Sequence, residues 1–535
     1  MKSNKMIKLF SLVALIGTSV FSYAQVDKVS TTQKFDEVLT YVNRLYVDDV
    51  DSKKLTDAAI VALLEKLDPH STFISKEEVS DANQQINGNF VGIGIRFQIL
   101  RDTLMVVATI PGGPSAKLGL MPGDKIVKIG SENVAGVGLK NSQVRDRLLG
   151  DRGTKVTVAV QRKKKVDPID YVITRDIIPL NSVDATYMIS DKTGYIKLNS
   201  FSRSSHQEVR SAIKELKEAG MKNLVFDLQG NGGGLLYASK YLADEFLSDD
   251  KLIVYSEGRA QPRADLNAER KGLWEDGRLV LLTNEYSASA SEILSGAVQD
   301  WDRGLIVGRR TYGKGLVQRP IDLTDGSQIR LTIARYYTPS GRSVQKSYEN
   351  LDDYRNDLLN RYDRGEFSNK DSISLPDSLK YYTLKNKRAV YGGGGIMPDY
   401  FVPLDTTEST DFLTALARSG SFSSYSLTYV NENREEILKN YPTFADYKKE
   451  FIVDKKFMKG FMDYAKEQDE ELEMNDDEYK TSESFIKLRI KAQIAQNIWG
   501  YNEFYQVYND SNEILQKAIE IIESNEYKSA LKSQK

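Results

Sequence analysis

The sequence predicts a multidomain α/β protein, and three observations lead to this fold class. First, 535 residues exceed the size of one ordinary domain, so several units with cores of their own are expected. Second, strand and helix patterns alternate between about residues 195 and 308, which is typical of helices packed on a sheet. Third, short strands separated by glycine and proline turns run from Phe90 to Arg162, while both ends of the chain have helical patterns.

The first segment of the chain has the pattern of a signal peptide. Three lysines lie within the first eight residues, and a short apolar stretch follows from Leu9 to Val20. Small residues then suit cleavage after Ala24. The apolar stretch is short for a helix that spans a bilayer, and an uncleaved anchor is the alternative interpretation. We therefore expect residues 1–24 to be a signal peptide and the mature protein to be exported and periplasmic.

Four further regions follow. Residues 25–83 are expected to be helical, because apolar residues from Phe35 to Leu45 recur at helix spacing. Residues 84–165 are expected to form a β-rich domain. Residues 166–406 carry the α/β alternation, with a capping box at Ser205 and Glu208 that predicts a helix start. Within them, the polar segment 346–388 has the composition of an insertion or a mobile flap. Residues 407–535 are expected to be helical again.

Composition excludes several classes of function. The formal net charge is -2, so nucleic acid is not expected as a partner. The chain has no cysteine, which removes cysteine nucleophiles, disulfides and thiolate metal sites. Only His70 and His206 offer imidazole ligands, so catalytic zinc is not expected either. We expect no metal and no cofactor.

A candidate nucleophile lies where a predicted strand ends and a helix begins. The sequence there reads Ser287-Ala288-Ser289-Ala290-Ser291-Glu292. A serine at such a junction is exposed, and the free N–H groups of the helix N-terminus can stabilise an oxyanion. Ser289 and Glu292 also form a capping box, which explains both residues without any catalysis. This segment alone does not separate the two interpretations.

A serine nucleophile needs a base, and two candidates are available. Lys314 lies between two glycines, which allow the backbone to approach closely. To act as a base it must be neutral, which requires its pKa to fall about three units from roughly 10.4. His206 is the alternative base, although it lies in the first turn of a predicted helix.

Two glycine-rich segments also suggest anion binding. Asp227–Gly234 follows a buried strand and can direct amides at an oxyanion or a phosphate. Gly308–Lys314 fits the nucleotide-binding pattern G-x-x-x-x-G-K. However, Gly315 stands where that loop needs Ser or Thr, and the following residues have a strand pattern. Nucleotide binding is therefore not expected.

Several separated blocks resemble the C-terminal processing (tail-specific) peptidases, over roughly residues 35–405. The blocks are Leu67-Asp68-Pro69-His70-Ser71, Phe90–Gly94, Pro122-Gly123-Asp124, Asp227–Gly234, Ser287–Glu292, Gly313-Lys314-Gly315 with Gln318, Tyr336–Arg342 and Gly395–Asp399. The resemblance implies a ClpP/crotonase-like α/β peptidase core with an inserted PDZ domain at residues 84–165.

The resemblance also implies roles for individual residues. Ser289 would be the nucleophile, Lys314 the general base and Gln318 the residue that orients Lys314. The oxyanion hole would consist of the backbone N–H groups of Gly233 and Ala290. In the PDZ domain, Gly92-Ile93-Gly94-Ile95 would bind a peptide carboxylate while the peptide adds as a strand.

The glycine-rich loop departs from the family pattern. That pattern is close to D-L-R-N-N-P-G-G, whereas Gln229, Gly230 and Gly232 stand here in place of Arg, Asn and Pro. The two following glycines remain, so the oxyanion donor is expected to be present. Loss of the proline makes the unfolded loop more flexible, which puts its preorganisation in question.

The sequence therefore predicts an exported serine endopeptidase that cleaves proteins with free C-termini at or near those ends. The alternative is a catalytically inactive PDZ scaffold that only binds peptides. The resemblance further suggests a homo-oligomer, a dimer, with the N-terminal helices and the tail at its contacts. An adaptor protein is a further candidate partner.

Overall fold

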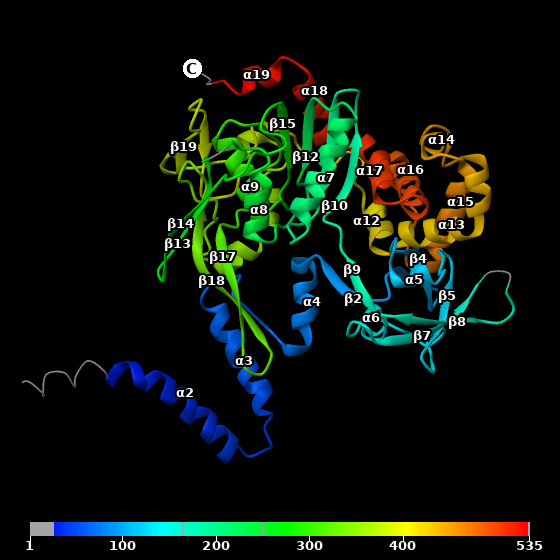
Figure 1. The fold of residues 1–535 in the computed structure, drawn as a ribbon, viewed down its shortest axis with the longest axis horizontal. Coiled ribbons are helices and arrows are strands. Elements are labelled where there is room, and N and C mark those ends of the chain that lie inside the picture. Colours follow the sequence, from blue (N-terminus) through cyan, green and yellow to red (C-terminus); the bar gives the residue numbers. More distant parts are fainter. Residues whose placement is uncertain (1–25, 163–164, 249, 533–535) are drawn as a thin grey trace, which may run out of the picture. The chain divides into compact units, whose positions relative to one another are not determined.

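The computed structural model describes residues 26–162, 165–248 and 250–532 (Figure 1). The predicted signal peptide lies outside these residues. In one compact unit, the described residues up to Ser75 associate with Pro320–Leu331. In the other, the described residues between Lys76 and Arg319 associate with those from Thr332 onward.

The described residues of the first unit up to Ser75 form two helices and one short strand. Helix α2 (Val26–Leu45) and helix α3 (Ser52–Glu65) precede strand β1 (Thr72–Ile74), which pairs antiparallel with residues 328–330. Apolar side chains on α2 remain exposed, and Leu45 is 75% exposed. Phe35 and Val38 share this exposed face at helix spacing.

A six-stranded sheet forms the centre of the second unit. Its order is β10-β11-β12-β15-β16-β21, in which β10 is antiparallel to β11 and the other neighbours are parallel. The strands are β10 (Val183–Met188), β11 (Thr193–Leu198), β12 (Asn223–Asp227), β15 (Arg278–Thr283), β16 (Leu305–Gly308) and β21 (Tyr400–Phe401).

Helices pack on both faces of this sheet, as its buried strands require. Leu224 and Phe226 of β12 join a core with α7 (Ser205–Glu218), α8 (Leu236–Ala243) and α9 (Ala290–Asp300). Val225 belongs to the core with α18 (Glu513–Glu523) and α19 (Glu526–Ala530). Alternate residues of a strand point to opposite faces, so one apolar strand supplies both cores.

The predicted capping box of α7 does not form, and that prediction is wrong. The N-cap residue of the helix is Ser204, and the Ser205 hydroxyl donates to the carbonyl of Ser202 at 2.9 Å. The Glu208 carboxylate instead accepts the N–H groups of Ser182 at 2.6 Å and Val183 at 2.9 Å. Because the N–H groups of this distant segment donate to the Glu208 carboxylate, it does not cap the helix.

The β-rich domain is a sheet of order β3-β4-β5-β7-β8, with β6 paired to β5. Its elements are β3 (Ile95–Leu100), β4 (Thr103–Thr109), α5 (Pro114–Lys117), β5 (Lys125–Ile129), β6 (Glu132–Asn133), α6 (Asn141–Leu148), β7 (Lys155–Gln161) and β8 (Ile169–Thr174). Helix α4 (Lys76–Asn87) precedes it, and β2 (Asn89–Gly92) pairs with β9 (Asp176–Pro179).

The polar segment 346–388 is packed against the core. It contains α10 (Leu351–Arg355), α11 (Asp357–Asp363), two 3₁₀ turns (Lys370–Ser372 and Asp377–Leu379) and β19 (Lys380–Tyr382), which pairs with β20 (Ala389–Tyr391). Arg361 is 1% exposed and forms an ion pair with Glu366, which also binds Arg310. Arg361 also donates to the carbonyl of Thr311 at 3.2 Å, so the segment reaches the chain next to Lys314.

The remaining described elements are four strands of one sheet and the helical tail. The strands are β13 (Leu252–Gly258), β14 (Gln261–Asn267), β17 (Leu316–Asp322) and β18 (Gln328–Tyr337). The tail comprises α12 (Asp411–Arg418), α13 (Ser421–Asn440), α14 (Phe444–Glu450), α15 (Lys455–Gln468), α16 (Asp476–Ile498), α17 (Tyr501–Tyr508) and the 3₁₀ turn Asn509–Ser511, with an aromatic-rich core. In the part of the chain that is described, no helix has the length and apolar character needed to cross a membrane.

Candidate active site

Three loops meet at the carboxyl edge of the central sheet. The glycine-rich loop follows β12, the Ser289 segment follows β15, and the Lys314 turn follows β16. These strands are parallel neighbours, so their carboxyl ends lie at the same edge. In open α/β sheets this edge is where ligands bind.

Ser289 occupies a strained backbone conformation between β15 and α9. Its φ is 56° and its ψ is -112°, and positive φ is uncommon for a residue with a side chain. Such conformations cost about 1–3 kcal/mol and cluster at active sites. The turn is held by its neighbours: the Ala288 N–H and the Ser291 hydroxyl donate to the carbonyl of Asn231 at 3.0 and 2.9 Å. The strain is therefore supported by the glycine-rich loop.

Glu292 connects the Ser289 segment to the Lys314 turn. Its Oε2 accepts the N–H of Ser289 at 2.8 Å and the N–H of Lys314 at 2.9 Å. Its Oε1 accepts the Thr311 hydroxyl at 2.6 Å and the N–H of Gly313 at 2.7 Å. Burial raises the pKa of Glu292, while these four donors act in the opposite direction. The sequence had offered Glu292 only as a cap; the structure adds the contacts to the second loop.

Lys314 lies half-buried in the turn before β17 (Leu316–Asp322) and points at Gln318. Its Nζ donates to the Gln318 Oε1 at 3.0 Å. Gly313 has a φ of 89°, which only glycine adopts freely, and an added Cβ would approach the backbone of Gly394 and Gly395 to 3.2 Å. The close approach explains why a glycine precedes the lysine. The orienting role of Gln318 stays a prediction.

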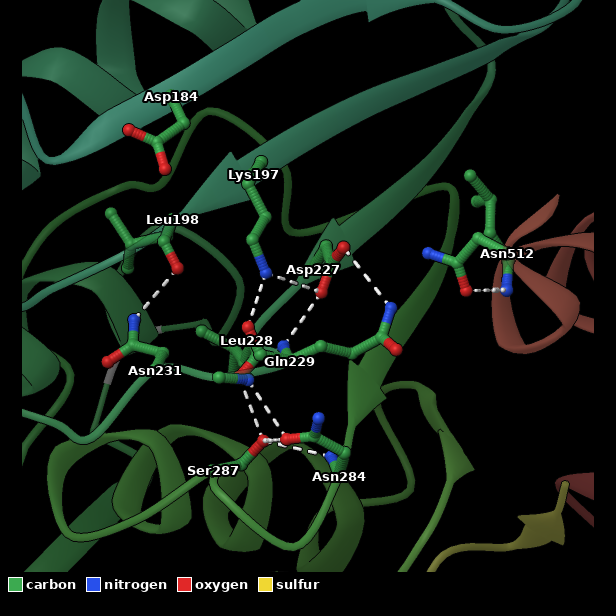
Figure 2. Close-up of polar contacts among 12 residues, drawn as sticks. Asp184, Lys197, Leu198, Asp227, Leu228, Gln229, Asn231, Asn284, Ser287 and Asn512 are labelled. Carbon is green, nitrogen blue, oxygen red and sulfur yellow. Dashed lines mark hydrogen bonds and ion pairs between the residues drawn. The ribbon is translucent and has the colours of Figure 1, made fainter. Parts of the chain in front are cut away.

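The glycine-rich loop is fixed by side chains from neighbouring strands, as Figure 2 shows. Lys197 of β11 binds the Asp227 carboxylate at 3.1 Å and also contacts the carbonyl of Gln229. The Asp227 carboxylate accepts the N–H of Gln229 at 2.7 Å. Asn284 accepts the N–H of Gly230 at 2.9 Å. The loop is therefore held without the proline of the family pattern.

Asn231 extends this support to the predicted oxyanion donor. It is fully buried, and its side-chain amide donates to the carbonyl of Leu198 at 2.9 Å (Figure 2). Its Oδ1 accepts the N–H of Gly233 at 2.9 Å. A Cβ on Gly233 would lie 2.8 Å from the Ser289 Cβ and 2.9 Å from the Ala290 nitrogen, so only glycine fits there. To bind an oxyanion, the Gly233 N–H must be shared with, or released by, Asn231.

His206, the alternative base, is engaged elsewhere. Its Nε2 lies 2.7 Å from the Glu245 Oε1, and Glu245 also binds Arg210. Burial alone would raise the pKa of Glu245, but the hydrogen bonds from His206, the Leu273 N–H and Arg210 lower it. The contact with the ionised Glu245 therefore gives His206 a structural role.

The second candidate site is a groove in the β-rich domain. The segment Gly92-Ile93-Gly94-Ile95 joins β2 to β3, and a cavity of about 560 Å³ opens beside it. Its apolar lining includes Phe90, Ile93, Ile95, Phe97, Leu148 and Leu149. An ion pair at 2.9 Å between Arg145 of α6 and Asp81 of α4 lies at the same cavity. Such a groove suits an apolar chain end beside an open strand.

Fold and sites together define a serine peptidase that carries a PDZ domain. The model of peptidase family S41 matches residues 192–352, and the PDZ domain model matches residues 105–162. Residues 412–500 match a family of unknown function.

Comparison with known proteins gives the same class. The chain is 35% identical over 317 residues to a carboxy-terminal-processing protease of Bartonella bacilliformis. The aligned residues cover 58% of this chain and 72% of that protein. It is 34% identical to a probable CtpA-like serine protease of Staphylococcus aureus, covering 58% and 62%. A solved photosystem II D1 C-terminal processing protease has 30% identity and a TM-score of 0.33, covering 58% and 89%. The chain belongs to peptidase family S41, among the carboxy-terminal-processing proteases.

Proposed function

We propose that this chain is an exported endopeptidase that cleaves protein substrates at or near their C-termini with a Ser289/Lys314 dyad. The observation that carries the proposal is the Glu292 carboxylate, because one of its oxygens accepts the backbone N–H groups of both dyad residues. The contact between Lys314 and Gln318 supports Lys314 as the base.

The geometry suggests a sequence of steps. Neutral Lys314 accepts the hydroxyl proton of Ser289 while Oγ attacks the scissile carbonyl carbon. The N–H group of Ala290, and that of Gly233 once it is shared with or released by Asn231, stabilise the resulting oxyanion. Protonated Lys314 then gives the proton to the leaving amine, which leaves an acyl-enzyme on Ser289. Water, deprotonated by Lys314, then attacks the acyl carbon, and Lys314 returns this proton to the Ser289 Oγ as the acyl group leaves. Gln318 keeps the Lys314 amine in place throughout.

The PDZ groove supplies the preference for chain ends. Its apolar lining suits an apolar terminal side chain, and the segment Gly92–Ile95 would bind the free carboxylate. The upstream chain would then enter the active site.

Hydrolysis of an unfolded reporter with an apolar C-terminus tests this function. We expect cleavage by wild type and by His206→Ala, and loss of cleavage in Ser289→Ala and Lys314→Ala. The same reporter with two aspartates at its end is the control for the groove and should be cleaved more slowly. Absence of cleavage by all variants, wild type included, would contradict the enzyme and favour the peptide-binding scaffold.

Export and assembly are further parts of the proposal. Cleavage after Ala24 would release a mature periplasmic chain that begins at Gln25, which N-terminal sequencing of the exported protein tests. The exposed apolar face of α2 supports a homo-dimer. Light scattering should show a dimer for wild type and a monomer for Phe35→Glu/Leu45→Glu. A wild-type monomer would contradict this, and an added adaptor would then be the next partner to test.

A further inference from the structure

Tyr336 lies at the junction of the two loops that carry the predicted dyad. It belongs to β18, is 1% exposed and is part of the core beneath α9. Its hydroxyl donates to the carbonyl of Lys314 at 2.6 Å and lies 3.1 Å from the carbonyl of Ser289. Its backbone N–H donates to the carbonyl of Gly315 at 3.0 Å. One residue therefore contacts both loops through polar groups.

These contacts complement those of Glu292. The carboxylate accepts the N–H groups of Ser289 and Lys314, and the Tyr336 hydroxyl faces the carbonyl oxygens of the same two residues. Each dyad residue is thus held at both polar groups of its backbone. The two loops come from different strands, so local sequence cannot fix their separation.

We infer that Tyr336 is a positioning residue. Its hydroxyl proton is shared by the carbonyl oxygens of Ser289 and Lys314 and so sets the distance between the two residues. The inference rests on the proposed function, because it assumes that these two residues react together. Ser289 needs support because its φ of 56° is strained, and Lys314 needs it because the glycines on both sides restrict the backbone of its turn less than other residues would. A misplacement of about 1 Å lowers rates by about 100-fold in enzyme sites.

A buried tyrosine that merely satisfies its hydroxyl is the simpler interpretation, and one observation argues against it. The core that contains Tyr336 also contains Phe201, Phe226 and Phe246, so an aromatic ring needs no hydroxyl to pack there. Burial first, and then the charge of Glu292, raise the pKa of Tyr336 well above its ordinary value. The hydroxyl therefore remains a donor at any working pH.

The test is Tyr336→Phe, which removes one oxygen and keeps the ring. Tyr337→Phe is the matched control, because Tyr337 is the next residue of the same strand and stacks on Tyr255 with ring centroids 4.8 Å apart. For each variant we would measure kcat and KM on the reporter, and the labelling of Ser289 by a fluorophosphonate. Titration with the same probe counts the competent sites.

We expect Tyr336→Phe to fold, to keep its KM within about twofold, and to lose about tenfold or more in kcat and in labelling rate per titrated site. Tyr337→Phe should match wild type. A lower count of competent sites with a normal rate per site would mean that the hydroxyl acts on stability alone, and would overturn the inference. Wild-type rates in Tyr336→Phe would overturn it as well. If wild type itself were labelled at another serine, the proposed dyad would fail instead.

Discussion

The active-site edge of the central sheet and the PDZ groove differ in what lines them. At the edge, Ser289 and Lys314 lie among hydrogen-bonded polar groups, and the Glu292 carboxylate alone accepts four hydrogen bonds. The groove is lined mainly by apolar side chains, with the Arg145–Asp81 pair beside them. Fixed dipoles favour a charge that develops during reaction, whereas an apolar cavity favours capture of a chain end. Changes at the edge should therefore alter kcat, and changes in the groove should alter KM.

The largest effect is expected for Glu292→Gln. All four contacts require the side chain to accept a hydrogen bond. In glutamine, an amide nitrogen replaces one carboxylate oxygen, and this donor would face two N–H or O–H donors. We expect kcat to fall about 100-fold at little change in KM, measured by steady-state cleavage of the reporter. Glu285→Gln, which alters a buried glutamate paired with Arg309, is the control for general damage. Equal losses in both variants would contradict the assigned role.

Lys197→Met should have the next largest effect. It removes the cation beneath the glycine-rich loop and leaves Asp227 buried without its ion pair. We expect kcat to fall about tenfold and the free energy of unfolding to fall by about 3 kcal/mol in urea denaturation. Lys197→Met/Asp227→Asn removes the unpaired charge and should regain stability without regaining kcat. If kcat recovered with stability, the pair would serve folding alone.

Phe97→Glu tests the groove. A carboxylate in the apolar lining should repel an apolar chain end with a free carboxylate and raise KM about tenfold, with kcat unchanged. Val137→Glu, at a position of the same domain that is 52% exposed, is the matched control. A fall in kcat with constant KM would show that the groove takes part in the chemical step, and the contrast between the two regions would not hold.

The smallest effect is expected for Gln229→Ala. The side chain of this residue reaches Asp227 at 3.3 Å, but the loop is held through its backbone groups. We expect kcat and KM to stay within about threefold of wild type. A larger loss would show that the Gln229 side chain, which replaces the arginine of the family pattern, supports the loop.

Motif patterns predicted the fold class and the family, because strand and helix periodicity and short blocks are local in sequence. The contacts that hold the proposed dyad are not local. The pattern S-x-x-E occurs at Ser205 and at Ser289, yet Glu208 binds the chain at the start of β10 and Glu292 binds a second loop. Which N–H groups compete for a carboxylate depends on tertiary neighbours.

The support of the glycine-rich loop also depends on tertiary neighbours. Its sequence put the preorganisation of the loop in question, because the family proline is missing. The support comes from Lys197, Asn284 and the buried side chain of Asn231, none of which the sequence singled out (Figure 2). A polar residue at the end of a buried parallel strand, such as Lys197, was the available signal.

The most direct test of the dyad is to identify the residue that a fluorophosphonate labels, in wild type and in Lys314→Met. We predict that mass spectrometry finds the adduct on Ser289 in wild type and that Lys314→Met, folded by circular dichroism, labels at least about 100-fold more slowly. Labelling of a different serine, or an unchanged rate in Lys314→Met, would contradict the Ser289/Lys314 mechanism.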